Sequence, residues 1–320
     1  MKKTEVTRLG IMTVVILVLL LIEIFFNDGG TSAFILKLFT FPRIVLACLL
    51  GVVYALSGFL FQLTFKNPLA SPDIVGINAG ASAGALVTFM IVGVAGVYLS
   101  IGAVIGAATV CAIALYYAKP MRSATFALRL VLIGIALATL STSVVAYIIS
   151  ILPINEAQQS MQWLSGSLNS ASWDTNILLL VILLLCIGAL AYLNKTLGVL
   201  ELAEYSAQSL GVNPIKYRGI VLGIAVILAA SATAVTGPVM FVAFLSPQLA
   251  RILVPEAKFR LLRTALTGVL FMLAADVIAQ HIVPGQKFPV GAITGVLGAV
   301  YLLWFLVQQR QKLTVEESTK

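Results

Sequence analysis

The chain has 320 residues, of which 60% are hydrophobic and only 10% are charged, and its formal net charge is +8. Soluble domains carry roughly 25% charged residues, so this chain has too few charges to cover itself with a water-compatible surface. A soluble fold is therefore excluded. A lipid bilayer is the environment in which this composition is stable.

A helix needs about 20 predominantly apolar residues to cross a bilayer. The sequence predicts an all-α, polytopic membrane protein made of a single transmembrane domain over residues 1–320. The first apolar segment follows a basic start and lacks a small-residue cleavage site, so we interpret it as a retained span and not a signal peptide. About ten spans are expected, at 10–26, 42–63, 73–93, 97–118, 129–150, 175–194, 218–236, 238–254, 264–282 and 290–307.

The basic residues predict the orientation. With an even number of spans, both termini lie on one side of the membrane. All of the 20 Lys and Arg residues except Lys37, Arg43 and Lys287 then fall on that side. Because cytoplasmic loops are enriched in Lys and Arg, we expect both termini in the cytoplasm. The same asymmetry explains the positive net charge without a nucleic-acid partner.

Motifs for enzymatic chemistry are missing from the sequence. It has no GxxxxGK[ST] phosphate loop, so we do not expect this chain to hydrolyse ATP. Its one histidine, His281, stands outside any HExxH pattern, and its three cysteines show no CxxC spacing. We expect no catalytic residue, metal site or bound cofactor. Asp276 lies deep in a late span, where a role in helix packing is favoured and proton or substrate coupling is the alternative.

Glycines recur four residues apart within the expected spans. Small residues at this spacing let helices approach closely in lipid. We therefore predict tight packing of the bundle at these positions, with a pore lining as the alternative reading. The glycines concerned are Gly76, Gly80 and Gly84, then Gly102 and Gly106, and finally Gly291 and Gly295.

A proline-containing segment follows the second span, from Phe65 to Gly76. Pro68 and Pro72 cannot continue a helix and predict an extended turn. The side chain of Asn67 is expected to hydrogen-bond its own backbone in that turn.

The segment at about 195–217 interrupts the apolar background on the cytoplasmic side. Leu200–Pro214 is predicted to form a short amphipathic helix, which Gly211 caps in the left-handed conformation and Pro214 stops. Such a helix could lie on lipid or dock onto a soluble protein. Its acidic residues Glu201 and Glu204 disfavour an anionic leaflet, so a protein partner is favoured.

Two further segments carry helix-breaking residues. In Thr236–Arg251, Pro238 and Pro247 predict broken or kinked helices, which are tolerated at membrane depth where they line a cavity or are covered by protein. Gly285–Gly295 predicts an outer turn that leads into the last span.

In this order, the segments resemble the FecCD-type permease family of ABC importers. Some positions depart from the family pattern: Thr40 stands in place of an arginine, and Met240, Ala243, Gln248 and Gln280 replace other usual residues. The matching motifs are Asn-Pro-Leu-Ala at Asn67–Ala70, Ser-Ala-x-x-Leu-Gly at Ser206–Gly211, Gly-Pro-x-x-Phe-Val at Gly237–Val242, Leu-Ala-Asp at Leu273–Asp276, and Pro-x-Gly-x-x-Thr at Pro289–Thr294.

The resemblance implies a multi-pass permease of the cytoplasmic (inner) membrane. Its implied partners are ABC ATPase subunits that use ATP, an extracytoplasmic substrate-binding protein, and a second permease copy or a sibling permease. Iron-siderophore chelates are the favoured substrate, with haem and vitamin B12 as alternatives. An ion-coupled secondary transporter and an intramembrane enzyme are the competing classes.

The resemblance also implies roles for particular residues. Arg43 and Lys287 are expected to dock the binding protein, although Lys287 could simply anchor its span at the headgroups. The ATPase is expected to contact Glu201, Leu202, Glu204, Ser206, Ala207, Leu210 and Gly211. The path and its inner gate are expected at Asn67, Pro68, Leu69, Thr139, Ser141, Thr142 and Ser143, where the alternative is that the hydroxyls bond back to helix carbonyls.

Overall fold

The computed structural model describes residues 3–25, 36–93, 97–118, 126–202, 204–255, 260–283 and 286–318. Regular structure in these ranges is helical, apart from an isolated bridge between Val283 and Gln286. The elements are α1 (Lys3–Phe25), η1 (Leu36–Thr40), α3 (Phe41–Phe65), α4 (Ile77–Val92), α5 (Val97–Ala118), α6 (Phe126–Ile151), α7 (Ile154–Leu164), α8 (Trp173–Tyr192), α9 (Asn194–Leu200), α10 (Glu204–Ser209), α11 (Pro214–Thr236), α12 (Val242–Leu253), α13 (Arg260–His281) and α14 (Val290–Ser318).

The all-helical fold class is confirmed, and the described helices are those of a multi-pass membrane protein. Within the described residues, 7 helices are long and apolar enough to cross a membrane: α1, η1 with α3, α5, α6, α8, α11 and α13. Shorter apolar helices, at Ile77–Val92, Val242–Leu253 and Val290–Phe305, occupy the positions of the other three expected spans. The full count of ten crossings stays a prediction. Helix α7 was not expected, because its sequence reads as a polar connection.

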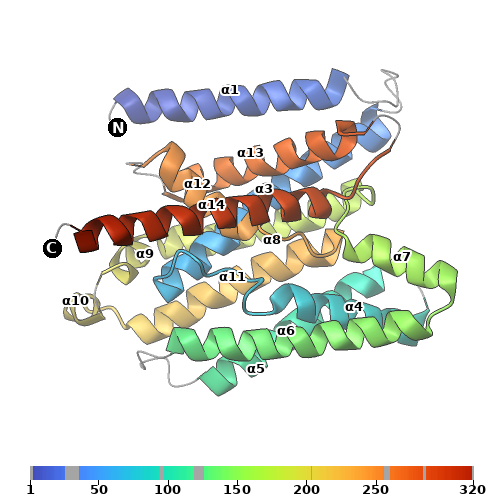
Figure 1. Cartoon of the computed structure of the whole chain (residues 1–320), viewed down its shortest axis with the longest axis horizontal. Coiled ribbons are helices and arrows are strands. Elements are labelled where there is room, and N and C mark those ends of the chain that lie inside the picture. Colours follow the sequence, from blue (N-terminus) through green and yellow to red (C-terminus); the bar gives the residue numbers. More distant parts are fainter. Residues whose placement is uncertain are drawn as a thin grey trace.

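The helices run side by side along the long axis of the molecule (Figure 1). The start of α1 and the end of α14 lie at the same end of the bundle as α9 and α10, and α7 lies toward the opposite end. A hydrogen bond from Arg8 Nη1 to the Leu253 carbonyl, 3.4 Å long, joins the start of α1 to the end of α12. The placement of both termini in the cytoplasm stays a prediction.

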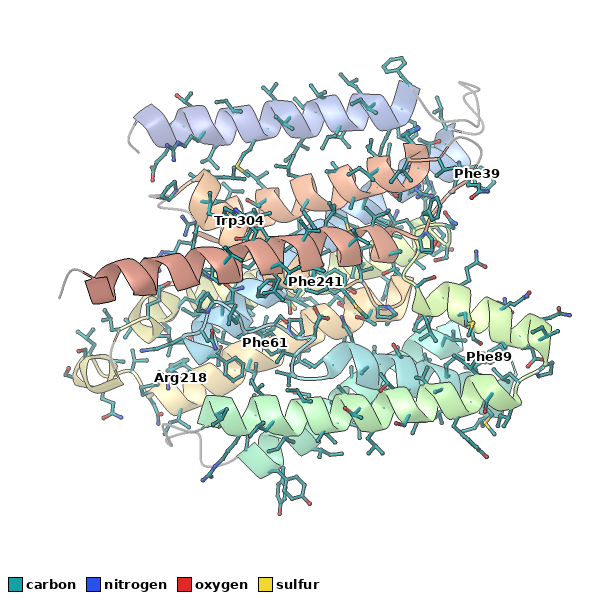
Figure 2. The ribbon with its side chains drawn as sticks, in the orientation of Figure 1. Phe39, Phe61, Phe89, Arg218, Phe241 and Trp304 are labelled. Carbon is teal, nitrogen blue, oxygen red and sulfur yellow. The ribbon has the colours of Figure 1, made fainter. Side chains whose placement is uncertain are left out.

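Helix α3 is the centre of the bundle. Buried residues make up 78% of its most apolar window, against 17% in α1 and in α6. Its neighbours include α11, α12 and α13, and Phe61 on α3 is fully buried whereas Trp304 on α14 is 47% exposed (Figure 2). Two buried hydrogen bonds join α3 to α11: Ser57 Oγ donates to the Ala225 carbonyl at 2.7 Å, and the hydroxyls of Tyr54 and Thr233 lie 3.1 Å apart.

Glycines set the closeness of this packing. A Cβ placed on Gly58 of α3 would lie 1.6 Å from the carbonyl oxygen of Ala243 in α12. On the other flank, a Cβ on Gly51 would lie 2.6 Å from the carbonyl oxygen of Gly268 in α13. A side chain at either position would therefore force the helix backbones apart.

Glycines also allow close backbone contact between α4 and α5. A Cβ on Gly84 would lie 2.2 Å from the Gly102 carbonyl oxygen, and one on Gly106 would lie 2.1 Å from that of Gly80. The predicted packing role of the glycines is confirmed at these four positions. It does not extend to Gly295, where an added Cβ meets nothing within 4 Å.

Replacing Gly58 with Ala should destabilise the protein, because the new methyl group overlaps the backbone of α12. We expect a loss of at least about 1–3 kcal/mol, the usual cost of overpacking. Gly223→Ala is the matched control, since this helical glycine on α11 has open space around it. Melting temperatures of the detergent-purified variants give the comparison. Equal melting temperatures would contradict the close contact.

Candidate functional site

A break in the bundle separates α11 from α12, where the sequence predicted it. Gly237 ends α11 with φ 75° and ψ 180°, and Phe241 precedes α12 in the left-handed conformation with φ 66°, so both residues have a positive φ. A Cβ on Gly237 would lie 2.1 Å from the Trp163 carbonyl oxygen, which gives a second reason for glycine there. The prediction that Gly237-Pro238 interrupts the apolar stretch is confirmed.

Buried polar side chains hold the broken segment. The backbone N–H of Phe241 donates to Asp73 Oδ2 at 3.4 Å, and Asn78 Nδ2 donates to the other carboxylate oxygen of Asp73. Thr233 Oγ1 in turn lies 2.8 Å from Asn78 Oδ1. Irregular backbone at membrane depth requires such cover by protein groups. This network therefore explains how the break is tolerated.

The turn after α3 has the predicted local chemistry. Asn67 Oδ1 accepts a hydrogen bond from the N–H of Leu69 at 2.9 Å, so the expected side-chain turn is confirmed. Lys66 ends α3 in the left-handed conformation, with φ 49°. Gln248 Nε2 on α12 donates to the Pro68 carbonyl at 2.9 Å. The turn is thus attached to the helix that follows the break.

The helices of the segment at 195–217 differ from the predicted one. The segment contains two short helices, α9 and α10, and not one helix over Leu200–Pro214. Two interactions fix the chain where the helix was expected to begin: an ion pair of Glu201 with Arg260, and a hydrogen bond from Lys66 Nζ to the Leu202 carbonyl. The sequence pattern gave no sign of these long-range contacts.

The residues expected to contact an ATPase divide between two environments. Leu202 and Leu210 are 44% and 62% exposed, and Ser206 and Gly211 are also exposed, whereas Ala207 is buried against the bundle. Glu204 begins α10, and its side chain lies outside the described part of the structure.

The predicted end of this segment is confirmed. Gly211 follows α10 with φ 76°, and Pro214 opens α11. Leu202 and Leu210 are two large apolar side chains that this segment leaves exposed.

The hydroxyl residues of α6 bond within their own helix. The hydroxyls of Thr139, Thr142 and Ser143 donate to carbonyl oxygens of Ile135, Thr139 and Thr139 respectively, each at 2.9 Å. Those three side chains are exposed on the single chain, and Ser141 is buried. The alternative interpretation therefore describes three of the four hydroxyls, and their role in a path stays a prediction.

Helix α6 also touches the segment that follows the Asn67 turn. A Cβ on Gly134 would lie 2.7 Å from the Cα of Val75. The fold therefore brings the helix that carries the hydroxyls against the segment that begins with the predicted gate.

A buried ion pair lies toward the end of the bundle away from α10. Arg43 Nε donates to Asp276 Oδ2 at 3.0 Å, and Arg43 Nη2 donates to Asp276 Oδ1 at 2.6 Å. Their side chains are 12% and 0% exposed. Arg43 Nη1 also donates to Asn169 at 2.6 Å, and Gln280 donates to Asp276 at 3.0 Å. Sequence reasoning missed this pair, although both charges stand alone in apolar segments.

The two residues expected to dock a binding protein are placed differently. Lys287 is exposed, whereas the guanidinium of Arg43 is engaged by the carboxylate of Asp276. Docking through either residue stays a prediction. Asp276 agrees with the packing role that the sequence favoured. Among the described residues, no group of three or more His, Cys, Asp or Glu side chains is placed to hold a metal ion.

Comparison with known proteins places the chain in a family. It matches the FecCD transport family over residues 5–308. The chain belongs to the FecCD family. Relatives include the ferric enterobactin transport system permease protein FepG of Escherichia coli, 32% identical over 85% of this chain and 82% of that protein. Another is the Fe(3+)-citrate import system permease protein YfmE of Bacillus subtilis, 35% identical over 87% of this chain and 84% of that protein.

The fold of this FecCD protein also matches a solved structure. A metal-chelate type ABC transporter in an inward-facing conformation aligns with a TM-score of 0.82 and 27% sequence identity. The alignment covers 95% of this chain and 99% of the other. The motifs at Asn67, Gly211 and Gly237 all lie within the part of the chain that matches the FecCD family.

Replacing one partner of the ion pair in this FecCD protein should lower the free energy of unfolding more than replacing both partners. Asp276→Leu leaves the Arg43 charge buried without its partner, which typically costs about 3–5 kcal/mol. The double variant Arg43→Met with Asp276→Leu should recover most of that loss, because neither charge of the pair remains. Asp174→Leu, at an exposed acid on α8, is the control. Unfolding free energies of all the variants test this. The pair is contradicted if the losses of unfolding free energy in the single variants Arg43→Met and Asp276→Leu add up to the loss in the double variant.

Proposed function

We propose that this chain forms the membrane path of an ABC importer that moves an iron-siderophore-type chelate inward across the cytoplasmic (inner) membrane. Membership of the FecCD transport family makes it a transport subunit, the permease of a metal-chelate importer. The observation that carries the proposal is the match to a metal-chelate type ABC transporter over 95% of the chain.

The substrate is the finer part of the proposal. Ferric enterobactin and Fe(3+)-citrate stand in the names of relatives described above. Other relatives carry hemin or cobalamin in their names, at 32% and 34% identity. We favour a ferric siderophore and keep haem and vitamin B12 as alternatives.

The energy source is proposed to be ATP, hydrolysed by separate ATPase subunits. Those subunits would contact the exposed end of the bundle at Leu202, Ser206, Leu210 and Gly211, where two large apolar side chains stand in solvent. Nucleotide binding can drive transport only if the ATPase contacts differ between two states of the permease. A second permease copy and an extracytoplasmic binding protein complete the proposed importer.

The gate is proposed at the turn of Asn67, Pro68 and Leu69, next to α6. The hydrogen bond from Gln248 to Pro68 supports this, because it links the turn to the broken α11–α12 segment. A movement of that segment would then be transmitted to the turn.

An ion-coupled secondary transporter is the alternative. It would use titratable or ion-binding groups within the membrane, and Asp276 was the candidate in the sequence. Its carboxylate is bound by Arg43 on both oxygens, so it is engaged in packing. That geometry favours the ATP-driven proposal.

Uptake by cells tests the proposed function. A deletion strain should lose uptake of radiolabelled ferric siderophore, and the wild-type chain should restore it. Leu210→Glu should restore less than about a tenth of the uptake, because a charge in an apolar protein contact is desolvated without a partner. The matched variant Leu210→Met keeps the apolar surface and should restore uptake fully.

The proposal fails if the deletion strain takes up every ferric chelate at the wild-type rate. Uptake of haem or vitamin B12 lost in its place would transfer the substrate assignment to the alternative. Full uptake with Leu210→Glu would remove α10 from the ATPase contact, even if transport itself is confirmed.

Docking of the binding protein is proposed to involve Lys287. Arg43 would be a second contact if it left Asp276 and paired with an acidic residue of the binding protein. Charges at the rim of an interface mainly set the association rate and are screened by salt. Lys287→Glu should therefore slow association of the binding protein with the reconstituted importer, and the effect should shrink at high salt. Lys195→Glu, at an exposed lysine on α9, is the control. Unchanged association rates at low salt would rule out docking through Lys287.

A further inference from the structure

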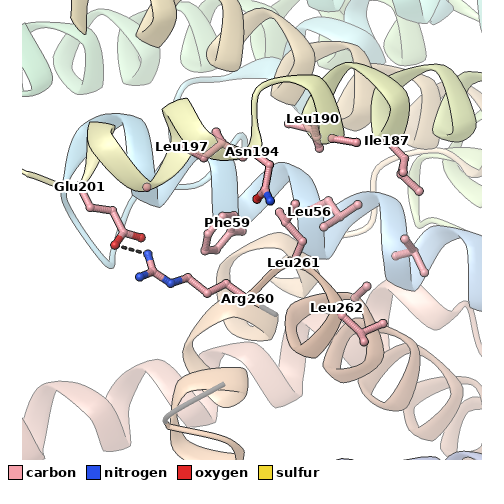
Figure 3. Close-up of a pocket in the computed structure, with 14 residues that line it drawn as sticks. Leu56, Phe59, Ile187, Leu190, Asn194, Leu197, Glu201, Arg260, Leu261 and Leu262 are labelled. Carbon is pink, nitrogen blue, oxygen red and sulfur yellow. Dashed lines mark ion pairs between the residues drawn. The ribbon is translucent and has the colours of Figure 1, made fainter. Parts of the chain in front are cut away.

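An apolar groove opens beside α9, at the end of the bundle that carries residues 195–217, the segment proposed to contact the ATPase and here named the coupling segment. It has a volume of 590 Å³ and lies between α3, α8, α9 and α13. Figure 3 shows the side chains of Leu56, Ile187, Leu190 and Leu262 along the groove and the Glu201–Arg260 ion pair at one end. Phe59 and Gly198 also line the groove.

A basic pocket adjoins the polar end of this groove. Its volume is 490 Å³, and its described lining includes Lys66, Arg251, Arg260 and Arg263 against the single acid Glu201. Four basic side chains and one acidic side chain leave three positive charges in excess. Positive charge crowded beside an apolar region favours an anionic ligand.

The guanidinium of one of these arginines, Arg263, is buried with one of its N–H groups lacking a hydrogen-bond acceptor among the described residues. Arg263 is 7% exposed, and its Nη1 donates to the carbonyl oxygens of Val254 and Pro255. Its Nε is buried and has no hydrogen-bond partner among the described residues. A buried donor left in this way is costly unless a ligand or water accepts from it.

The groove and the basic pocket are continuous. Phe59, Glu201 and Arg260 line both cavities. A ligand that fills both must therefore have an anionic group joined directly to a long apolar body. A phospholipid with an anionic headgroup has that chemistry, and basic pockets between transmembrane helices on the cytoplasmic side typically bind such headgroups.

We propose that this groove and pocket hold one anionic phospholipid from the leaflet on the side of α9 and α10. The headgroup phosphate lies among Lys66, Arg251 and Arg263, and an acyl chain lies along Leu56 and Leu190. The site borders Glu201 and Asn67, so the bound lipid connects the membrane to the coupling segment and the turn. An acidic segment of a protein partner would satisfy the basic pocket but would leave the apolar groove empty.

Native mass spectrometry of the full-length, delipidated chain tests this. The protein is incubated with equal amounts of dioleoyl phosphatidylglycerol and dioleoyl phosphatidylcholine, which differ in headgroup charge. We expect the first lipid retained to be phosphatidylglycerol, with a preference of about tenfold or more. Glycerol 3-phosphate, which has the anionic phosphate without acyl chains, should not displace it at equal concentration.

Two kinds of variant locate the site. Lys66→Gln with Arg251→Gln should remove the preference, whereas Lys216→Gln, at an exposed lysine on α11, should keep it. Gly198→Leu fills the groove at a position where an added Cβ meets nothing within 4 Å, so it should abolish retention without unfolding the protein. Gly223→Leu, on α11 with equally open surroundings, should retain the lipid.

Retention unchanged by both Gly198→Leu and the double variant would overturn the proposal, as would equal retention of the two lipids. Displacement by glycerol 3-phosphate would make the pocket a site for free phosphate compounds. If the double variant loses ATPase association but keeps phosphatidylglycerol, the basic pocket belongs to the protein partner. Melting temperatures equal to wild type show that each variant is folded.

Discussion

Close backbone contact around α3 is the constraint on which the rest of the structure depends. Lipid provides little hydrophobic drive for helices to associate, so van der Waals packing at small residues must hold the bundle together. Gly51 and Gly58 let α13 and α12 lie directly on α3. This contact places the broken segment before α12 against the loop before α4, and it places Asp276 of α13 within reach of Arg43.

Many of the described buried polar groups are hydrogen-bonded by protein, because lipid cannot satisfy them. The carboxylate of Glu23 and the Nε of Arg263 are exceptions. Asp73 and Asn78 hold the backbone near Phe241, and Arg43 neutralises Asp276. The described residues at the opposite end keep an excess of basic charge around Arg263, together with exposed apolar side chains on the coupling segment. The Arg43–Asp276 pair is thus compensated within the protein, whereas the other end is suited to partners of opposite charge or apolar surface.

Much of the fold could be predicted from the sequence, because the relevant physics is local. Apolar segment length predicts helices that can cross a membrane, and seven described helices are long and apolar enough to do so. Turn chemistry is equally local: Asn67 bonds its own backbone, Gly211 adopts the left-handed conformation, and Gly237 with Pro238 interrupts the helix. The order of the motifs was enough to indicate the FecCD family, to which the chain belongs.

Contacts between residues distant in sequence were decided by the tertiary structure alone. No local pattern states that Arg43 will meet Asp276, or that Arg260 will pair with Glu201 at the start of the predicted helix. The hydroxyls of α6 illustrate the limit. The sequence allowed back-bonding and a path lining equally, and only the folded structure shows which carbonyls accept. Residue type and spacing determine the local conformation of each segment. Which helices then contact one another depends on where glycines let their backbones approach closely.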